Sequence, residues 1–372
     1  MRASKTNNMV ALGELIELCD ERNLEGMYGT QDVMGMTITK ELIPTKADVT
    51  GADLKKFLVV KPNEFVYNPR THGKRIGLGY NNTKKTFIIS WNNTAFRVKD
   101  KKRLYHAYLY MYLNRIEWDR HACFRSWGSS TEVFSWSEFC LMEIPLPDIE
   151  VQRELVAVYE GLKQLAEENE AMLEPLAHAC EAFIINCKKN YPTQALGEYI
   201  EEVNERNSNG IYDESRLYGV KNDGSFIHSI ADKTDLDLSK YKVVSKGDFC
   251  YTLRIIIGSI ALYQEETPCI VSTSYTIFRL KNEQKLLSAF LNIIFRRKEF
   301  HRYAKVNSWG SAKDNFSFAD LCAVQIPIPP IEVQEKIVAL YRCYEECKRI
   351  AAEAREQLKT ICPALVQRGK QA

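Results

Sequence analysis

The sequence lacks the segments that mark membrane-spanning, secreted and disulfide-rich proteins. No apolar run reaches the roughly 20 residues needed to cross a bilayer, and the opening residues, MRASKTNNMV, have no apolar core of a secretory signal. The eleven cysteines are scattered and include no C-x-x-C pair, so neither a disulfide framework nor a zinc ribbon is expected. With 45% hydrophobic and 26% charged residues, the composition is that of an ordinary folded protein. Together these features predict a cytoplasmic location.

The sequence also lacks the signatures of an enzyme. There is no G-x-x-x-x-G-K-[ST] loop, because Gly73 and Lys74 have neither the upstream glycine nor the hydroxyl residue, so ATP hydrolysis by this chain is not expected. Residues 68–70 (NPR) share only the opening of an amino-methyltransferase tetrapeptide and are predicted to form a turn. The six histidines form no spaced cluster, so no metal site or histidine-activated nucleophile is predicted. The expectation is a non-catalytic chain that binds no cofactor or metal itself.

What the sequence contains instead is a long internal repeat. Residues 10–23 read VALGELIELCDERN, and residues 194–207, which lie 184 positions later, read QALGEYIEEVNERN. After the loss of two residues, the later matching segments are SWGS at 126–129 and 308–311, and IPLPDIEVQ at 144–152 against IPIPPIEVQ at 326–334. Each copy has the size of one domain with an appendage, which predicts two tandem domains rather than a solenoid.

Basic residues concentrate in one part of each copy, although the formal net charge is only +2. Residues 55–103 hold thirteen lysines and arginines against two acidic residues, and residues 281–305 hold seven against two. Such density, interleaved with aromatic and amide residues, is typical of a surface that binds a polyanion. A solvated surface face would give the same pattern, so the charge alone leaves both interpretations open.

Each copy is predicted to begin with an α+β globule, over residues 1–147 and 191–329. Short β-branched and aromatic runs, bounded by Gly, Pro and Asn, predict strands in both copies. These runs cover residues 57–60, 65–67 and 87–91 in the first copy, and 242–244, 249–253 and 270–279 in the second. A helical stretch is predicted to follow, over 104–118 and 285–303. The globules should therefore contain small β-sheets with helices.

Each copy is predicted to end in a long helix, over residues 148–190 and 330–372. The helices start after the proline-containing runs, because proline lacks an amide donor and restrains the residue before it. Apolar residues then recur with alternating spacings of four and three, as in a coiled coil. The positions predicted to pack are Val151, Leu155, Val158, Leu162, Asn169, Val333, Ile337, Leu340 and Leu358. Asn169 either fixes the register of the helices or faces solvent where Pro175 bends the first helix.

The two predicted helices can bury their apolar stripes against each other or against a partner. An antiparallel pair is the simplest solution, and it would relate the two globules by a pseudo-twofold axis. About 35 helical residues at roughly 1.5 Å each span about 50 Å, so the helices would act as a rigid spacer. Dimeric DNA-binding proteins place their recognition elements about 34 Å apart, which makes a duplex with two half-sites a fitting target.

Over essentially its whole length, the chain resembles the specificity subunit of a type I restriction-modification system. The resemblance rests on the doubled L-G-E-[LY]-I-E, S-W-G-S and I-P-[LI]-P-x-I-E-V-Q motifs. It implies that each globule is a target recognition domain that reads one half of a bipartite, non-palindromic double-stranded DNA sequence. It also implies that the helices dock two methyltransferase (modification) subunits and that motor-nuclease (restriction) subunits join the complex. S-adenosylmethionine, ATP and Mg would then be bound by those partners, which methylate adenine N6 and translocate and cleave DNA.

The DNA contacts are expected where the two copies differ. Residues 70–75 read RTHGKR and their counterparts at 254–259 read RIIIGS, so the two globules are predicted to read different sequences. Phosphate contacts should come from lysine and arginine, and base contacts from Arg, Asn, Gln, Ser or aromatic side chains. The predicted DNA-binding residues are Arg70, His72, Lys74, Arg75, Lys84, Lys85, Trp127, Ser129, Arg254, Trp309 and Ser311. Packing within the globule is an equally good interpretation of the two tryptophans.

An alternative function is a duplicated protein-interaction scaffold whose basic loops face an acidic protein partner. The two functions can be distinguished by DNA binding at raised salt concentration. Specific binding of one duplex survives at salt concentrations that release random duplex. Retardation of one particular duplex under those conditions would favour the DNA-binding function.

Overall fold

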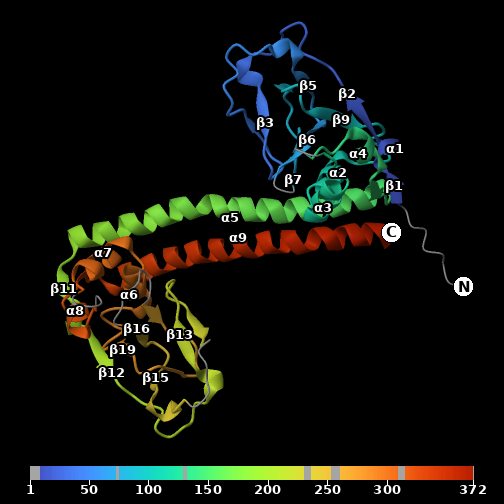
Figure 1. Ribbon diagram of the computed structural model, residues 1–372. Coiled ribbons are helices and arrows are strands. Elements are labelled where there is room, and N and C mark those ends of the chain that lie inside the picture. The colour runs from blue at the N-terminus through green and yellow to red at the C-terminus, as the bar shows by residue number, and fades with distance from the viewer. Residues whose placement is uncertain are drawn as a thin grey trace, which may run out of the picture. The chain divides into compact units, whose positions relative to one another are not determined.

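The computed structural model describes residues 9–72, 75–128, 132–229, 236–252, 260–308 and 315–371. The chain divides into two compact units, which are unit 1 (Met1–Glu168 with Ile350–Ala372) and unit 2 (Asn169–Arg349). Both divisions fall inside long helices, α5 (Ile149–Asn190) and α9 (Ile331–Gln371). Each unit therefore contains one globule and a part of both long helices (Figure 1).

The globule of unit 1 is built on an antiparallel sheet with the strand order β2-β9-β6-β7. These strands are β2 (Ile16–Cys19), β9 (Thr94–Val98), β6 (Phe65–His72) and β7 (Arg75–Tyr80). Two-stranded antiparallel ladders join β1 (Met9–Ala11) to β10 (Glu143–Pro145), β3 (Met34–Met36) to β4 (Leu42–Pro44), and β5 (Leu58–Val60) to β8 (Phe87–Ile89). The helices are α1 (Leu12–Leu15), α2 (His106–Leu113), α3 (Ile116–Phe124) and α4 (Trp136–Leu141), with 3₁₀ turns at Thr30–Asp32 and Leu54–Lys56.

The globule of unit 2 repeats this arrangement, with the sheet order β12-β19-β16-β17. These strands are β12 (Ile200–Val203), β19 (Tyr275–Leu280), β16 (Phe249–Thr252) and β17 (Ala261–Leu262). The ladders join β11 (Thr193–Ala195) to β20 (Gln325–Pro327), β13 (Tyr218–Val220) to β14 (Phe226–His228), and β15 (Lys242–Val244) to β18 (Cys269–Val271). The helices are α6 (Ser288–Phe295), α7 (Lys298–Val306) and α8 (Phe318–Cys322), with 3₁₀ turns at Leu196–Glu198, Glu214–Arg216 and Leu238–Lys240.

The sheets and helices confirm the predicted α+β class with tandem globules and long helices. The predicted single helical stretches over 104–118 and 285–303 are wrong in one respect, because each is two helices. The break follows Asn114 in unit 1, where Arg115 has an extended backbone (φ −81°, ψ 150°), and it follows Arg296 in unit 2, where Arg297 is extended in the same way (φ −75°, ψ 140°). The apolar pattern continues across the break, so the sequence periodicity does not reveal it.

Equivalent aromatic residues form the core of each globule. In unit 1 the rings of Phe65 and Phe96 stack at 5.1 Å, and in unit 2 the rings of Phe249 and Phe278 stack at 5.0 Å. All four side chains are fully buried. Offset-stacked and edge-on rings contribute about 0.5–1.5 kcal/mol per pair beyond their burial, so these pairs hold the two central strands of each sheet together and fix the helices above them.

A buried glutamine anchors the start of each long helix. The Gln152 side chain donates to the carbonyls of Pro147 and Arg103, both at 2.8 Å, and accepts from the backbone amide of Tyr105 at 2.8 Å. Gln334 repeats these bonds with Pro329 (2.8 Å), Lys285 (3.0 Å) and Leu287 (2.9 Å). Both glutamines are 0% exposed. The glutamine of the I-E-V-Q motif is therefore a structural residue that binds the helix start to its globule.

The apolar face of α5 that packs against the globule differs from the prediction at one position, where Tyr159 is partly buried in place of Val158. In unit 1 Leu155 is buried and Tyr159 and Leu162 are partly buried, whereas the Val158 side chain is 46% exposed. Val151 packs against the core beside Leu155. In the sequence a packed face through Val158 and one through Tyr159 both fit the four-and-three spacing, because residues on either edge of the apolar stripe are apolar.

In unit 2 both long helices contribute to one packed region. Ile184 of α5 and Ile337 of α9 belong to the same core cluster, against which Val333 also packs. Leu340 and Asn169 are half-buried, as is Leu358 in the part of α9 that belongs to unit 1. Helix α5 continues unbroken past Pro175. No helix in the described part of the chain is long and apolar enough to cross a membrane.

Candidate nucleic-acid interface

The candidate interface of unit 1 begins with a bulge in β6. The register of β6 against β7 shifts between Tyr67, which pairs with Leu78, and Thr71, which pairs with Ile76. At the shift, the Asn68 side-chain oxygen accepts a hydrogen bond from the Arg70 amide at 3.0 Å. The predicted turn over residues 68–70 is therefore wrong, since these residues form a bulge inside a strand. A bulge bends its strand and redirects the side chains beyond it.

A second segment, sixty residues later, pairs with the strand beyond the bulge. The Phe134 amide donates to the Pro69 carbonyl at 2.7 Å, and the Thr71 amide donates to the Glu132 carbonyl at 3.1 Å. Trp127 and Val133 exchange both backbone hydrogen bonds, at 3.2 and 3.0 Å. We call this structure the arm, which comprises residues 69–72, 75–76, 126–128 and 132–134. The predicted residues Arg70, Arg75 and Trp127 therefore lie on backbone segments that are hydrogen-bonded to one another.

The arm retains unneutralised positive charge. Arg70 and Arg75 are exposed, and neither forms an ion pair with any carboxylate in the described ranges. Other basic residues of the 55–103 stretch are neutralised, since Lys56 pairs with Asp53 at 3.3 Å and Arg97 with Glu17 at 2.7 Å, and Lys61 pairs with Glu21. The charge available to a polyanion is therefore smaller than the sequence count and is concentrated on fewer residues.

Asp119 fixes the base of the arm. One of its carboxylate oxygens accepts from the Ile76 amide at 3.4 Å, directly after Arg75, and the other accepts from the Lys40 ammonium at 2.9 Å. Lys40 also donates to the Leu113 carbonyl at 2.8 Å. The two ion-pair side chains are 3% and 9% exposed, and burial lowers the pKa of Lys40. This buried pair joins the β3–β4 hairpin, α3 and the arm.

Lys84 and Lys85 do not join the arm. They lie in the loop after β7, at the opposite end of that strand from Arg75, and six strand residues span roughly 17–20 Å. Both are exposed, and Lys85 lines a cleft of about 550 Å³ with Asn82 and Thr83. The structure therefore separates the predicted cations of unit 1 into two groups.

Several predicted contacts cannot be placed on this surface. The side chain of His72, whose backbone pairs with Arg75 in the β6–β7 ladder, lies outside the described residues. The same holds for Lys74, Ser129, Arg254, Trp309 and Ser311. These assignments stay predictions. Trp127, by contrast, is 76% exposed, so its indole does not pack into the globule.

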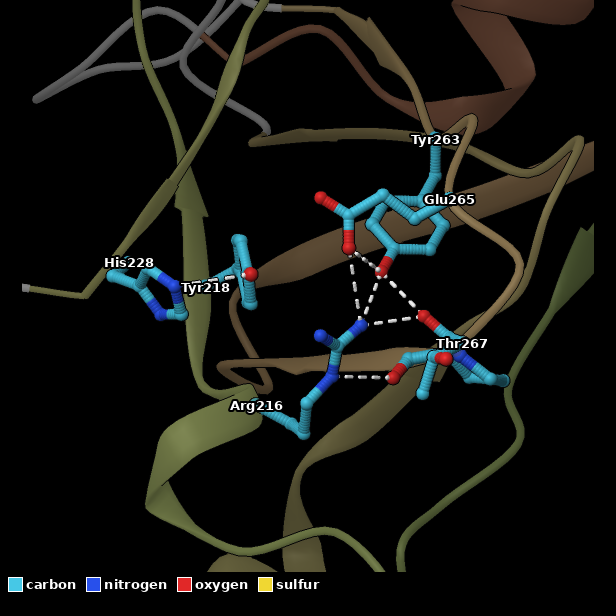
Figure 2. A network of polar contacts seen from close by, with 7 residues as sticks. Arg216, Tyr218, His228, Tyr263, Glu265 and Thr267 are labelled. Carbon is cyan, nitrogen blue, oxygen red and sulfur yellow. Dashed lines mark hydrogen bonds and ion pairs between the residues drawn. The ribbon is translucent and has the colours of Figure 1, made fainter.

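In unit 2 an arginine network supports the β13–β14 hairpin (Figure 2). The Arg216 guanidinium donates to the Tyr263 hydroxyl at 2.7 Å, to the Glu265 carboxylate at 3.3 Å, and to the carbonyls of Thr267 and Pro268 at 2.5 and 3.0 Å. It also lies 5.4 Å from the ring of Tyr218. Burial raises the pKa of Tyr263. Because this arginine donates to several groups of its own globule, the network has a structural role in unit 2.

The hairpin carries a second polar pair. Figure 2 shows the Tyr218 hydroxyl directed at His228, where the oxygen and the imidazole Nε2 are 3.1 Å apart. The two rings lie 4.3 Å apart. Over the described ranges, no group of three His, Cys, Asp or Glu side chains could hold a metal ion.

The second copy is similar to a known protein family. Residues 195–360 match the family described as "Type I restriction modification DNA specificity domain". Comparison with the curated proteins gives no match.

Solved structures also resemble the chain. One is the S subunit of a type I restriction-modification system from M. genitalium, with 13% identity, a TM-score of 0.57 and coverage of 99% of this chain and 98% of that chain. Another is the HsdS subunit from Thermoanaerobacter tengcongensis, with 17% identity, a TM-score of 0.44 and coverage of 98% and 96%. The likeness to the M. genitalium subunit shows a shared fold. The family match covers the second copy, and the motifs of that copy recur in the first.

Proposed function

We propose that this chain is the DNA-reading subunit of a type I restriction-modification complex, in which each globule binds one half of a bipartite duplex sequence. The observation that carries the proposal is the arm of unit 1, where Arg70, Arg75 and the exposed indole of Trp127 share a backbone held by Asp119. Unpaired arginines supply phosphate or guanine contacts, and an exposed ring supplies apolar contact with bases. The alternative, a scaffold for an acidic protein, is not favoured by the family match.

The two half-sites should differ. Residues 70–75 of the arm have a counterpart at 254–259 that retains only the arginine, and the basic stretch of the first copy is larger than that of the second. Sequence is read by side chains that reach base edges, whereas the shared scaffold sets geometry. A repeat with unlike loops therefore implies a non-palindromic target with a fixed separation.

The methyltransferase and motor-nuclease activities belong to partner subunits in this proposal. Specificity subunits of this family are generally non-catalytic. The long helices offer docking positions, since Val158 and Leu165 of α5 are 46% and 42% exposed and lie seven residues apart on one helix face. Adenine methylation with S-adenosylmethionine, and ATP-driven translocation with Mg, would then take place on two methyltransferase subunits and on the restriction subunits.

The direct test replaces the arginines of the arm. Arg70→Ala and Arg75→Ala in the complex with methyltransferase should each weaken duplex binding, and each lost phosphate contact should reduce the slope of log K against log salt by about 1. Lys56→Ala is the matched control, because Lys56 is an exposed cation of the same stretch already paired with Asp53. Unchanged affinity and slope for both arginine variants would remove the arm from the interface.

A cellular test reports both globules at once. Sequencing of methylated adenines in DNA from cells that express the chain with its methyltransferase should give one bipartite motif with a fixed spacer. A palindromic motif, or methylation without sequence preference, would contradict two unlike half-sites.

A further inference from the structure

Two large apolar side chains stand in solvent beside the arginines of the arm. Phe124, the last residue of α3, is 84% exposed, and Trp127 is 76% exposed. Single exposed apolar residues are common on protein surfaces. Two large exposed rings three residues apart in the chain, one of them in the arm that also carries Arg70 and Arg75, are a feature of the kind that marks an interaction site.

The geometry of α3 explains why the globule cannot cover Phe124. The buried face of the helix carries Trp118 and Ala122, which are four residues apart and 1% and 0% exposed. Phe124 follows Ala122 by two positions, or roughly 200° around the helix axis. Its ring is therefore directed away from the core while the helix keeps its packing.

The backbone that carries both rings is held in place. The Ser126 hydroxyl donates to the Ala122 carbonyl at 2.8 Å, and the Arg125 guanidinium donates to Glu138 at 3.0 Å. Trp127 is fixed by its two backbone bonds to Val133. Neither ring stacks on another aromatic ring in the described part of unit 1. Rigid backbone under free rings reduces the entropy lost when a ligand binds them.

We propose that Phe124 and Trp127 contact the bases of the first half-site directly, as an apolar wedge between the cationic contacts of the arm. This inference rests on the proposed function. The apolar groups of a duplex are the thymine methyl in the major groove and the faces of base pairs at an opened step. Arg70 and Trp127 both pair with Val133, and Arg120 precedes Phe124 by about one helical turn. These two arginines and Arg75 are exposed and form no ion pair among the described residues, and that charge favours DNA over a protein partner as the occupant.

The second globule carries a smaller apolar residue at the equivalent position. Val306 ends α7 as Phe124 ends α3, at the offset of 182, and is 71% exposed. Each globule thus exposes one apolar side chain at this place, aromatic in unit 1 and aliphatic in unit 2. The size difference predicts that the two half-sites differ in the base step that each apolar residue meets.

The experiment uses the chain in complex with its methyltransferase and two duplexes, one carrying the methylated motif found in cells and one random. Phe124→Ala and Trp127→Ala should each weaken binding of the motif duplex by about tenfold. Binding of the random duplex and the salt slope should stay unchanged, because no phosphate contact is lost. Leu24→Ala is the matched control, since Leu24 is 68% exposed in the same globule but lies outside the arm.

Phe124→Val tests whether the size of the ring matters for base contact. Valine keeps the position apolar and is the residue of the second globule at the equivalent position. It should leave folding intact and change the base preference within the first half of the motif only. A 2-aminopurine base in that half should brighten on binding the native complex and brighten less with Phe124→Ala, if a step is opened.

The outcomes separate this inference from the proposed function. If Arg70→Ala and Arg75→Ala weaken binding while both ring variants bind the motif duplex normally, the wedge is wrong and the DNA-binding function stands. If the ring variants lose methyltransferase in gel filtration but bind DNA normally as assembled complex, the patch is a protein contact and the wedge is again wrong. If the native complex does not prefer the motif duplex, the proposed function itself fails.

Discussion

In each globule a cationic side chain links a two-stranded hairpin to the helices. The cation lies on the hairpin in unit 1 and at the end of a helix in unit 2. In unit 1 Lys40, at the turn of the β3–β4 hairpin, reaches inward to Asp119 and to the Leu113 carbonyl. In unit 2 Arg296, at the end of α6, reaches outward to the carbonyls of Asp223 and Gly224 in the β13–β14 turn, at 2.5 and 3.2 Å. Both globules thus have polar contacts between hairpin and helices, and the cation comes from the hairpin in unit 1 and from a helix end in unit 2.

Sequence equivalence makes the exchange clear. Lys40 corresponds to Gly224, and both have a positive φ, of 64° and 73°. Asp119 corresponds to His301, which is buried. Burial lowers the pKa of this histidine and so favours its uncharged form. Unit 1 therefore buries a charge pair where unit 2 satisfies backbone carbonyls with a partly exposed arginine. A buried pair is the more vulnerable arrangement, because removing one partner leaves the other charge in a medium of low dielectric constant.

The largest expected effect comes from breaking this pair. Lys40→Met should lower the free energy of unfolding of unit 1 by about 3–5 kcal/mol, because Asp119 would remain buried without its cation. The positive φ at this position is equally unfavourable for methionine and lysine. Urea unfolding and hydrogen exchange of α3 peptides measure the loss.

Two controls define the result. The double variant K40M/D119L should recover most of the stability, since an apolar pair replaces an ion pair. Lys56→Met, which removes one member of the exposed Lys56–Asp53 pair, should change stability by no more than about 1 kcal/mol. A Lys40→Met protein as stable as the native chain would show that the tie in unit 1 is not the ion pair.

The residue after the helix break distinguishes the units in a second way. Arg297, whose side chain is 7% exposed, makes a double hydrogen bond to Glu181 of α5 at 3.0 and 2.5 Å and pairs with Glu299 at 2.8 Å. Its counterpart Arg115 instead lies 4.3 Å from the ring of Tyr112 and donates to that residue's carbonyl at 3.3 Å. Arg297 binds its globule to the long helix, whereas Arg115 acts within its own globule.

Arg297→Met should therefore destabilise unit 2 by about 1–2 kcal/mol. The effect is smaller than that of Lys40→Met because Glu181 and Glu299 are about half exposed and would return to water. Arg115→Met should cost about 0.5–1 kcal/mol, the usual contribution of a cation lying over an aromatic ring. Hydrogen exchange of α7 and α3 peptides compares the two variants, and equal losses in both units would contradict the distinction.

Features with a local cause could be predicted from the sequence. The repeat predicted two equivalent globules, and the prolines before each I-E-V-Q motif predicted where the long helices begin. Phe124 could have been found in the same way, because it falls off the face that Trp118 and Ala122 define. Phe124 was not among the predicted contacts because it lies outside the basic loops and the repeated S-W-G-S motif.

Features with a distant cause could not be predicted. Residues 68–70 have turn chemistry, and pairing with residues 132–134 draws them into a strand. Lys40 sits in a polar turn, where lysine is normally exposed, and its burial depends on an aspartate 79 positions away. Val158 and Tyr159 are both apolar enough to occupy the packed line of α5, and tertiary contacts select the second.

Acid pH should weaken unit 2 through His301. Burial lowers the folded-state pKa of this histidine below the ordinary 6.5, so as the pH falls below about 6.5 the unfolded chain takes up a proton before the folded chain does. The stability of unit 2 should then fall with pH, by at most about 1.4 kcal/mol per pH unit. Unit 1 has Asp119 at this position and lacks this contribution.

Comparison with His301→Asn isolates the titration from the other groups of the chain. Urea unfolding at pH 7.5, 6.5 and 5.5 should show a stability difference between native and variant proteins that shifts in favour of the variant as the pH falls. A difference that is constant across these pH values would show that His301 titrates alike in the folded and unfolded chains.

The smallest expected effect concerns the turn before β6 and β16. Asn63 and Gly247 are equivalent, and both have a positive φ, of 67° and 89°. Asparagine tolerates this region better than most residues, and nothing lies within 4 Å of a Cβ placed on Gly247. Gly247→Asn should therefore cost less than about 1 kcal/mol, while Gly247→Val, which is β-branched, should cost more, because only backbone strain is at issue. Urea midpoints of the two variants measure this difference, and equal midpoints would mean that the turn relaxes to a negative φ and that the two copies do not share its geometry.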